Sequence, residues 1–221
     1  MESERSFNDD QQSAESGDPR AQYDMALRYA RGDGCEPDAD LALDWLTRAA
    51  EGGFAPAQFD LAYHYAEGPA AGRDVEKAAR WFREAAEQGD RDAQYNIGVY
   101  YAHGRGVPQD DQRAVYWFEK AARQGDPAAA RVMGDSYAEG AGVVKDERAA
   151  FDWYAESARL GDPQGAYRLG LCYAAGQGTP RDNVKALYWL TRAAGAGHAD
   201  AQRTLDAYYA NRSAARDEGT P

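Results

Sequence analysis

The five tryptophans of this chain lie 36 residues apart, and this spacing constrains the fold more than any other feature. They are Trp45, Trp81, Trp117, Trp153 and Trp189. Other columns keep the same period: a glycine recurs from Gly17 to Gly197 and an alanine from Ala30 to Ala210. A fixed period of this size is typical of stacked repeats, in which each unit buries its core only against its neighbours.

The segment 17–52 indicates how one repeat folds. Asp18 followed by Pro19 suits the start of a first helix, because a carboxylate can accept a free backbone N–H and proline fits the first helical position. Gly32 ends that helix, and Asp38 caps a second one whose apolar residues recur at helical spacing. Two such helices joined by a short glycine turn lie antiparallel. The sequence therefore predicts an all-α fold, a right-handed α/α superhelical solenoid of antiparallel helix pairs with a 36-residue repeat.

The same period divides the chain into segments. Residues 1–16 keep a faint phase without the tryptophan, and we expect either a polar N-terminal cap on the stack or a disordered tail. Residues 213–221 are expected to form a disordered C-terminal tail. The solenoid is expected over 17–212, with complete repeats at 17–52, 53–88, 89–124, 125–160 and 161–196 and a half repeat at 197–212.

The segment 93–110, AQYNIGVYYAHGRGVPQD, is followed by Trp117-Phe118 and Gly125 and resembles a Sel1-like repeat. The resemblance covers about residues 17–212, and the 36-residue period separates it from the tetratricopeptide repeat of roughly 34 residues. It implies an all-α superhelix whose members act as adaptors or scaffolds, usually in bacteria. The segment 68–72, GPAAG, departs from the double-glycine turn, and we expect a reshaped loop there.

The acidic balance of the chain restricts its partners. The formal net charge is −12 and the sequence pI is about 4.7, which disfavours a nucleic acid as a ligand. Complementary charge favours a basic peptide or basic protein surface, although solubility alone also explains the acidity. The charge is uneven: residues 17–52 carry eight acidic and four basic side chains, and residues 161–196 carry two and four.

The cysteines and the apolar content indicate the cellular compartment in which the protein is expected. Cys35 and Cys172 are the only cysteines, and they lie nearly four repeats apart, so disulfide geometry excludes a bridge between them. This usage is typical of a reducing compartment. The polar N-terminus lacks the apolar run of a signal peptide, and no window approaches the roughly 20 apolar residues of a membrane span. We therefore expect a cytoplasmic protein that contacts no membrane.

No motif in the sequence points to catalysis. The Gly-x-Gly turns, such as Gly104 to Gly106, follow helices and recur with the repeat, so they are interpreted as turn glycines and not as a phosphate-binding loop. His64 and His103 can share a face in adjacent repeats, but too few further ligands exist for a metal site. Cys172 is interpreted as a small buried group. We expect no enzyme, no cofactor and no metal.

The positions that vary between repeats are the candidates for partner binding. In the first helix these are the columns of residues 24, 27, 28 and 31, which share one helical face. By the resemblance, the first helices line the concave surface. Tyr63 and Tyr100 are predicted as anchors of the interface, with packing between repeats as the alternative. The predicted partner-binding residues are Arg28, Arg31, Tyr63, His64, Glu67, Asn96, Val99, Tyr100, His103, Asp135, Glu139, Arg168 and Tyr208.

The function predicted from these features is that of a non-catalytic scaffold or adaptor. It would bind a protein or peptide in the groove lined by the first helices, as a monomer and without nucleic acid. The first alternative is a dedicated inhibitor or immunity protein that blocks one toxin or enzyme. The second is an enzyme or small-ligand receptor that uses Tyr63, His64 and His103.

Overall fold

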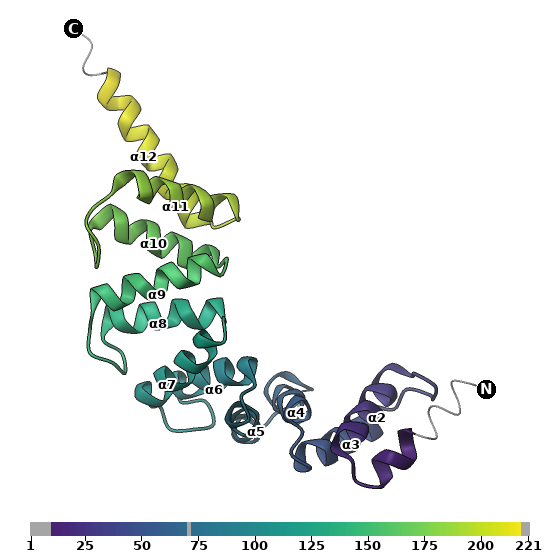
Figure 1. Cartoon of the computed structure of the whole chain (residues 1–221). Coiled ribbons are helices and arrows are strands. Elements are labelled where there is room, and N and C mark those ends of the chain that lie inside the picture. Colours follow the sequence, from purple (N-terminus) through teal and green to yellow (C-terminus); the bar gives the residue numbers. More distant parts are fainter. Residues whose placement is uncertain (1–9, 70–71, 218–221) are drawn as a thin grey trace. The chain divides into compact units, whose positions relative to one another are not determined.

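The computed structural model describes residues 10–69 and 72–217, and the regular structure within those ranges is helical (Figure 1). Helices alternate as first and second members of consecutive pairs, which confirms the predicted all-α solenoid. The first helices are α2 (Pro19–Arg31), α4 (Ala55–Glu67), α6 (Arg91–His103), α8 (Pro127–Glu139), α10 (Pro163–Ala175) and α12 (Ala199–Asp217). The second helices are α3 (Ala39–Glu51), α5 (Val75–Glu87), α7 (Asp111–Arg123), α9 (Glu147–Arg159) and α11 (Asn183–Gly195).

The chain divides into two compact units, residues 1–110 and residues 111–221, which we call unit 1 and unit 2. Unit 1 contains α2 to α6 and unit 2 contains α7 to α12. Within each unit, every labelled helix packs against the labelled helices that precede and follow it there. This is the neighbour-to-neighbour packing that a stacked repeat requires.

The aspartate column caps the second helices, as the sequence predicts. The Asp38 carboxylate accepts the backbone N–H groups of Asp40 and Leu41 at 3.0 and 2.9 Å. Asp74, Asp146 and Asp182 accept N–H groups at the starts of α5, α9 and α11 in the same way. Because capping satisfies a backbone donor that the helix leaves free, this column needs no catalytic explanation.

The second glycine of three Gly-x-Gly turns, at Gly106, Gly142 and Gly178, is required by a close approach between backbones. Gly106 has a φ of +65°, and a Cβ atom there would lie 2.1 Å from the Val75 carbonyl oxygen at the start of α5. Gly142 and Gly178 make the same approach to the start of α7 and α9. In the second repeat Gly68 is extended, with φ −62° and ψ −170°, whereas Gly32 and Gly104 are left-handed at the same position. Residues 70–71 of the loop that was expected to be reshaped lie outside the described residues.

The predicted core is built from the large and small columns together. Trp45, Trp81 and Trp117 are buried, whereas Trp153 and Trp189 are half-buried. Small residues stand where a larger side chain packs from the next helix: a Cβ atom at Gly134 would lie 2.5 Å from the Tyr154 ring. The periodic columns therefore pack as the sequence predicts, with three of the five tryptophans fully inside.

Both ends of the described chain are helical. Residues 10–15 form a helix, and Ala14 is only 1% exposed where it packs against Met25, Ala26 and Trp45. This part of the N-terminal segment packs on the first repeat, and residues 1–9 lie outside the described residues. At the other end α12 continues to Asp217, so the chain is helical over 213–217, where a tail was expected.

Candidate partner-binding surface

Unit 1 contains a hollow between α2, α3 and α4, which we call the first hollow. Its volume is about 570 Å³. Leu27, Leu43 and Leu46 supply much of its apolar wall, and Asp60 and His64 reach it from α4. The remaining lining residues are Ala26, Tyr29, Ala30, Pro37, Asp38, Ala39, Ala42 and Pro69. Leu27, Asp60 and His64 belong to the variable columns, and His64 is the one predicted partner-binding residue among those that line the hollow.

The first hollow exists because two positions between the first and second repeats carry small side chains, whereas the positions 36 residues later are aromatic. There, Phe82 and Tyr100 pack edge to face with ring centroids 5.4 Å apart, and both are buried. The residues 36 positions earlier are Leu46 and His64. A leucine and an imidazole occupy less volume than two six-membered aromatic rings, so space remains between the helices.

Asp60 places a carboxylate at the edge of this apolar space. It accepts a hydrogen bond from the Tyr23 hydroxyl at 2.7 Å. Burial, and then the bond to Asp60, raises the pKa of Tyr23 well above its ordinary value, so the hydroxyl keeps its proton. A neutral donor does not balance the charge of Asp60, and no Lys or Arg forms an ion pair with it within the described residues.

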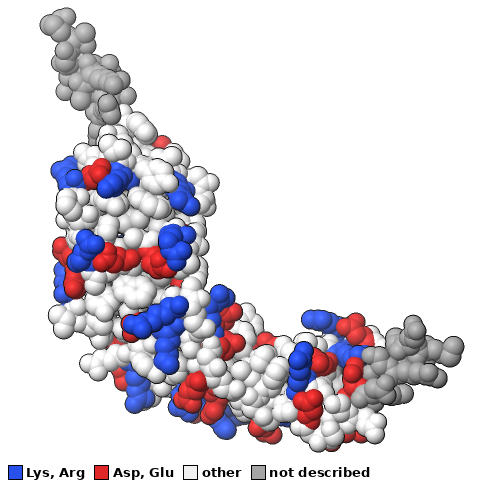
Figure 2. Space-filling view, viewed as in Figure 1, with Lys and Arg blue, Asp and Glu red and all other residues white. Residues whose placement is uncertain are grey.

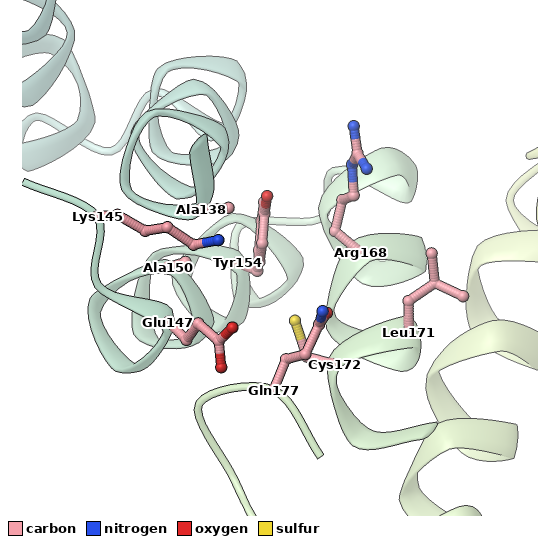
Figure 3. A pocket seen from close by; sticks show the side chains of 9 residues that line it. All are labelled: Ala138, Lys145, Glu147, Ala150, Tyr154, Arg168, Leu171, Cys172 and Gln177. Atoms are coloured by element: carbon pink, nitrogen blue, oxygen red, sulfur yellow. The ribbon is translucent and has the colours of Figure 1, made fainter. Parts of the chain in front are cut away.

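Unit 2 contains a second hollow, between α8, α9 and α10 (Figure 3). It has a volume of about 140 Å³, and eight of its nine lining residues stand three repeats after a residue of the first hollow. Tyr154 takes the place of Leu46, Cys172 that of His64, and Arg168 that of Asp60. The larger Tyr154 ring narrows the space, and the charge at the column of Asp60 is reversed.

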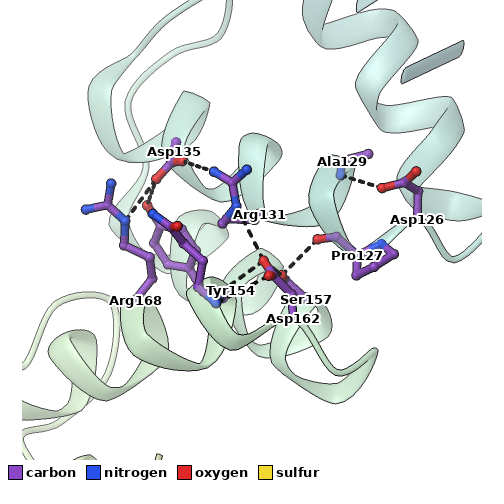
Figure 4. Close-up of polar contacts among 11 residues, drawn as sticks. Asp126, Pro127, Ala129, Arg131, Asp135, Tyr154, Ser157, Asp162 and Arg168 are labelled. Carbon is purple, nitrogen blue, oxygen red and sulfur yellow. Dashed lines mark hydrogen bonds and ion pairs between the residues drawn. The ribbon is translucent and has the colours of Figure 1, made fainter. Parts of the chain in front are cut away.

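The charges beside the second hollow compensate one another (Figure 4). Asp135 accepts a hydrogen bond from the Tyr154 hydroxyl at 2.8 Å and one from Arg131 at 3.1 Å. Arg168 lies 3.4 Å from the same carboxylate. Figure 2 shows basic and acidic side chains side by side on one face of this unit. Asp135 and Arg168, both predicted for partner binding, are thus engaged with each other.

The two tyrosines predicted as anchors differ in exposure. Tyr63 is 57% exposed, as expected of an interface residue. Tyr100 is 3% exposed, so the expectation that it faces solvent is wrong. It packs on Phe82, with the Arg105 guanidinium 5.0 Å from its ring centroid, and burial raises its pKa. The packing alternative therefore describes Tyr100.

The other predicted residues form no single cluster of contacts. Arg28 is half-buried and pairs with Asp10, so it ties the N-terminal helix to α2. The Asn96 side chain donates to the Asp92 carbonyl oxygen of its own helix at 2.8 Å. Glu67 lies 4.0 Å from Arg105. Arg31, His103 and Glu139 are exposed, and Val99 and Tyr208 are half-buried.

Buried glutamines are the polar residues that the sequence reasoning missed. Gln22, Gln58 and Gln94 are buried, and each side-chain amide donates to a backbone carbonyl oxygen eight residues earlier at 3.1 Å. They recur at the 36-residue period, so the periodicity of the sequence could have identified them as structural residues. Their hydrogen bonds are internal, which makes them structural and not part of a binding surface.

The cysteines and the possible metal ligands are dispersed among the described residues. In the part of the chain that the structure describes, no three His, Cys, Asp or Glu side chains gather to hold a metal ion. Both cysteines are free thiols, and burial raises the pKa of Cys172 to about 11, so this thiol is protonated at neutral pH. No helix among the described residues is long and apolar enough to cross a membrane.

Stacked helix pairs with hollows between consecutive repeats define a helical-repeat protein of the solenoid class. A family model described as Sel1 repeat matches five consecutive segments, each starting at or next to the first residue of a first helix. The segments are 19–54, 55–90, 91–126, 127–162 and 163–198. The chain therefore belongs to the Sel1 repeat family, whose members are generally protein-interaction scaffolds.

Solved structures agree with this assignment. A protective antigen of uropathogenic Escherichia coli with an SLR fold is 36% identical over 93% of this chain, with a TM-score of 0.84. The matched region spans only 44% of that antigen. A Sel1 repeat protein from Oxalobacter formigenes is 35% identical, with a TM-score of 0.76, and the match covers 87% of this chain and 77% of that one. No curated protein matches the chain.

Proposed function

We propose that this chain is a non-catalytic scaffold that binds a segment of a partner protein on the variable face of its first helices. The first hollow is the observation that supports this function best. It is the larger of the two hollows described above, it is mostly apolar, and residues of the variable columns line it. The proposal takes the protein to be a cytoplasmic monomer with a protein or peptide as its partner.

A solvated apolar hollow of this size favours binding for a physical reason. Covering apolar surface that was in contact with water makes the free energy of binding more favourable. Concave sites bury more ligand surface than flat ones. The exposed ring of Tyr63 lies on the same helix as Asp60 and His64, where it can extend the contact. The surrounding helices are held by caps and core columns, so the site is preorganised.

The interface between the second and third repeats supplies the design of a variant that removes the hollow without disturbing the fold. Replacing Leu46 by Phe and His64 by Tyr copies the Phe82–Tyr100 pair into the positions 36 residues earlier. The double variant should fill the hollow with side chains that the repeat already accommodates. Its thermal midpoint should equal or exceed that of the wild type, because the added rings bury further apolar surface.

The test is affinity capture from the native cell lysate with the wild type and the L46F/H64Y variant, read by mass spectrometry. The proposal expects a partner that the wild type retains and the filled variant loses. The variant Tyr63→Ala, which leaves the hollow open, should weaken capture without abolishing it. Equal capture by the wild type and the filled variant would exclude the first hollow as the binding site. One stoichiometric partner would favour the dedicated inhibitor, and several weaker partners the adaptor.

A further inference from the structure

We propose that the first hollow selects a partner segment in which a large apolar side chain stands next to a lysine or arginine, and that Asp60 recognises the cation. This inference rests on the proposed function and adds the chemistry of the partner. It follows from three observations: the apolar wall, an uncompensated carboxylate at its edge, and the opposite charge at the equivalent position in unit 2.

The apolar wall determines the first part of the ligand. Three leucines, two prolines and several alanines line the space, and they come from both helices of the first pair and from α4 with its following loop. Such a wall offers contact to a bulky aliphatic or aromatic side chain and few hydrogen bonds. A polar side chain would lose its hydration there without replacement.

The Asp60 carboxylate determines the second part of the ligand, which is the cation. Two aspartates line the hollow, but they differ in how their charge is satisfied. Asp38 accepts two backbone N–H groups at the positive end of α3, which stabilises its charge. Asp60 accepts only the neutral Tyr23 hydroxyl, and no cation of the described residues pairs with it. A cation from a partner would supply that missing interaction beside an apolar wall, where water screens it less.

The equivalent position in unit 2 carries the opposite charge. Arg168 stands 108 residues after Asp60, and it lines the second hollow as Asp60 lines the first. Its charge is already matched by Asp135 at 3.4 Å, with Arg131 and Tyr154 on the same carboxylate. The second hollow is thus narrow and its Arg168 is paired, whereas the first is wide and its Asp60 forms no ion pair within the described residues.

The test uses a positional-scanning library of acetylated, amidated decapeptides on the immobilised full chain. The wild type should enrich Lys or Arg adjacent to a large apolar residue. The best peptide, labelled with fluorescein, then gives a dissociation constant by fluorescence polarisation. Asp60→Asn keeps an acceptor for Tyr23 and removes the charge, so it should weaken this peptide by about tenfold or more. Glu51→Gln removes the same charge from an exposed position of α3 outside the hollow and should change the constant less than twofold.

Charge reversal sharpens the test. Asp60→Arg installs the residue found at the equivalent position of unit 2, and the enriched residue beside the apolar side chain should change from basic to acidic. Enrichment of apolar residues without a basic neighbour would overturn the inference, as would equal effects of Asp60→Asn and Glu51→Gln. A library with no enriched peptide would also overturn it.

The failure of this inference can be separated from the failure of the proposed function. If peptides bind and the L46F/H64Y variant loses them, the hollow is a binding site whatever the effect at Asp60. If the filled variant binds the same peptides as the wild type, the proposed function itself fails, because the segment then docks elsewhere.

Discussion

The side-chain amide of Gln22 donates a hydrogen bond to the carbonyl oxygen of Ala14 at 3.1 Å. Gln58 makes the same bond to Ala50 and Gln94 to Ala86, in each case to the last turn of the preceding second helix. The N-terminal helix at residues 10–15 therefore accepts from α2 the same hydrogen bond that α3 and α5 accept from the first helices that follow them. This contact explains how a segment without the repeat's tryptophan covers the open end of the stack.

The buried glutamines should contribute measurably to stability. Gln58→Leu preserves the approximate side-chain volume but removes the donor to the Ala50 carbonyl and the acceptor for the Gln88 side chain, and it should lower the free energy of unfolding by about 1–2 kcal/mol. Gln202 is the control, because it stands in the same column but is exposed and bonds only to Asp206. Urea denaturation of Gln58→Leu and Gln202→Leu measures the difference, and equal midpoints would contradict the structural role.

Two buried tyrosine hydroxyls should respond in opposite ways to removal. The Tyr100 hydroxyl has no hydrogen-bond partner among the described residues, so Tyr100→Phe should leave stability unchanged or raise it slightly. The Tyr154 hydroxyl donates to Asp135 at 2.8 Å, and Tyr154→Phe should cost about 1–2 kcal/mol. Denaturant unfolding of both variants tests the pair. A loss of equal size in Tyr100→Phe would reveal a partner for its hydroxyl.

Turn glycines should differ according to the space around them. Gly106→Ala combines a positive φ of +65° with a Cβ atom 2.1 Å from the Val75 carbonyl oxygen, so the backbone must shift. Gly197 has a φ of +90° and nothing within 4 Å of such a Cβ atom, so Gly197→Ala should cost only the conformational strain, about 1–2 kcal/mol. Thermal denaturation should show a clearly larger loss for Gly106→Ala. A smaller loss there would mean that the turn rearranges freely.

The buried Cys172 thiol should make stability depend on alkaline pH. Its pKa rises from about 9 to about 11 on burial. A raised folded pKa contributes stability below the unfolded value, and the contribution is lost as the pH rises through the folded value. Between about pH 9 and 11 the wild type should therefore lose more unfolding free energy than Cys172→Ala. Urea denaturation across that range is the measurement, with Cys35→Ala as the control, and parallel losses in both variants would contradict the prediction.

The comparison of Tyr63 with Tyr100 shows where sequence reasoning reached its limit. Both residues stand in variable columns of first helices, and both were expected to face solvent. Whether such a side chain is covered depends on its neighbour across the interface between repeats. Phe82 of the preceding second helix packs on Tyr100. The sequence of α6 alone does not contain that information.

The repeat, the helix ends and the turn glycines could all be predicted from the sequence. Each depends on residues that are close along the chain: an aspartate caps the helix that follows it, and a glycine adopts a positive φ that other residues avoid. The packing of three helices was needed to reveal that a hollow opens between the first two repeats and that Asp60 lies at its edge without an ion pair within the described residues. A hollow is the volume left between side chains of three helices, so it depends on the sizes of Leu46 and His64 together and on where the nearest cations lie.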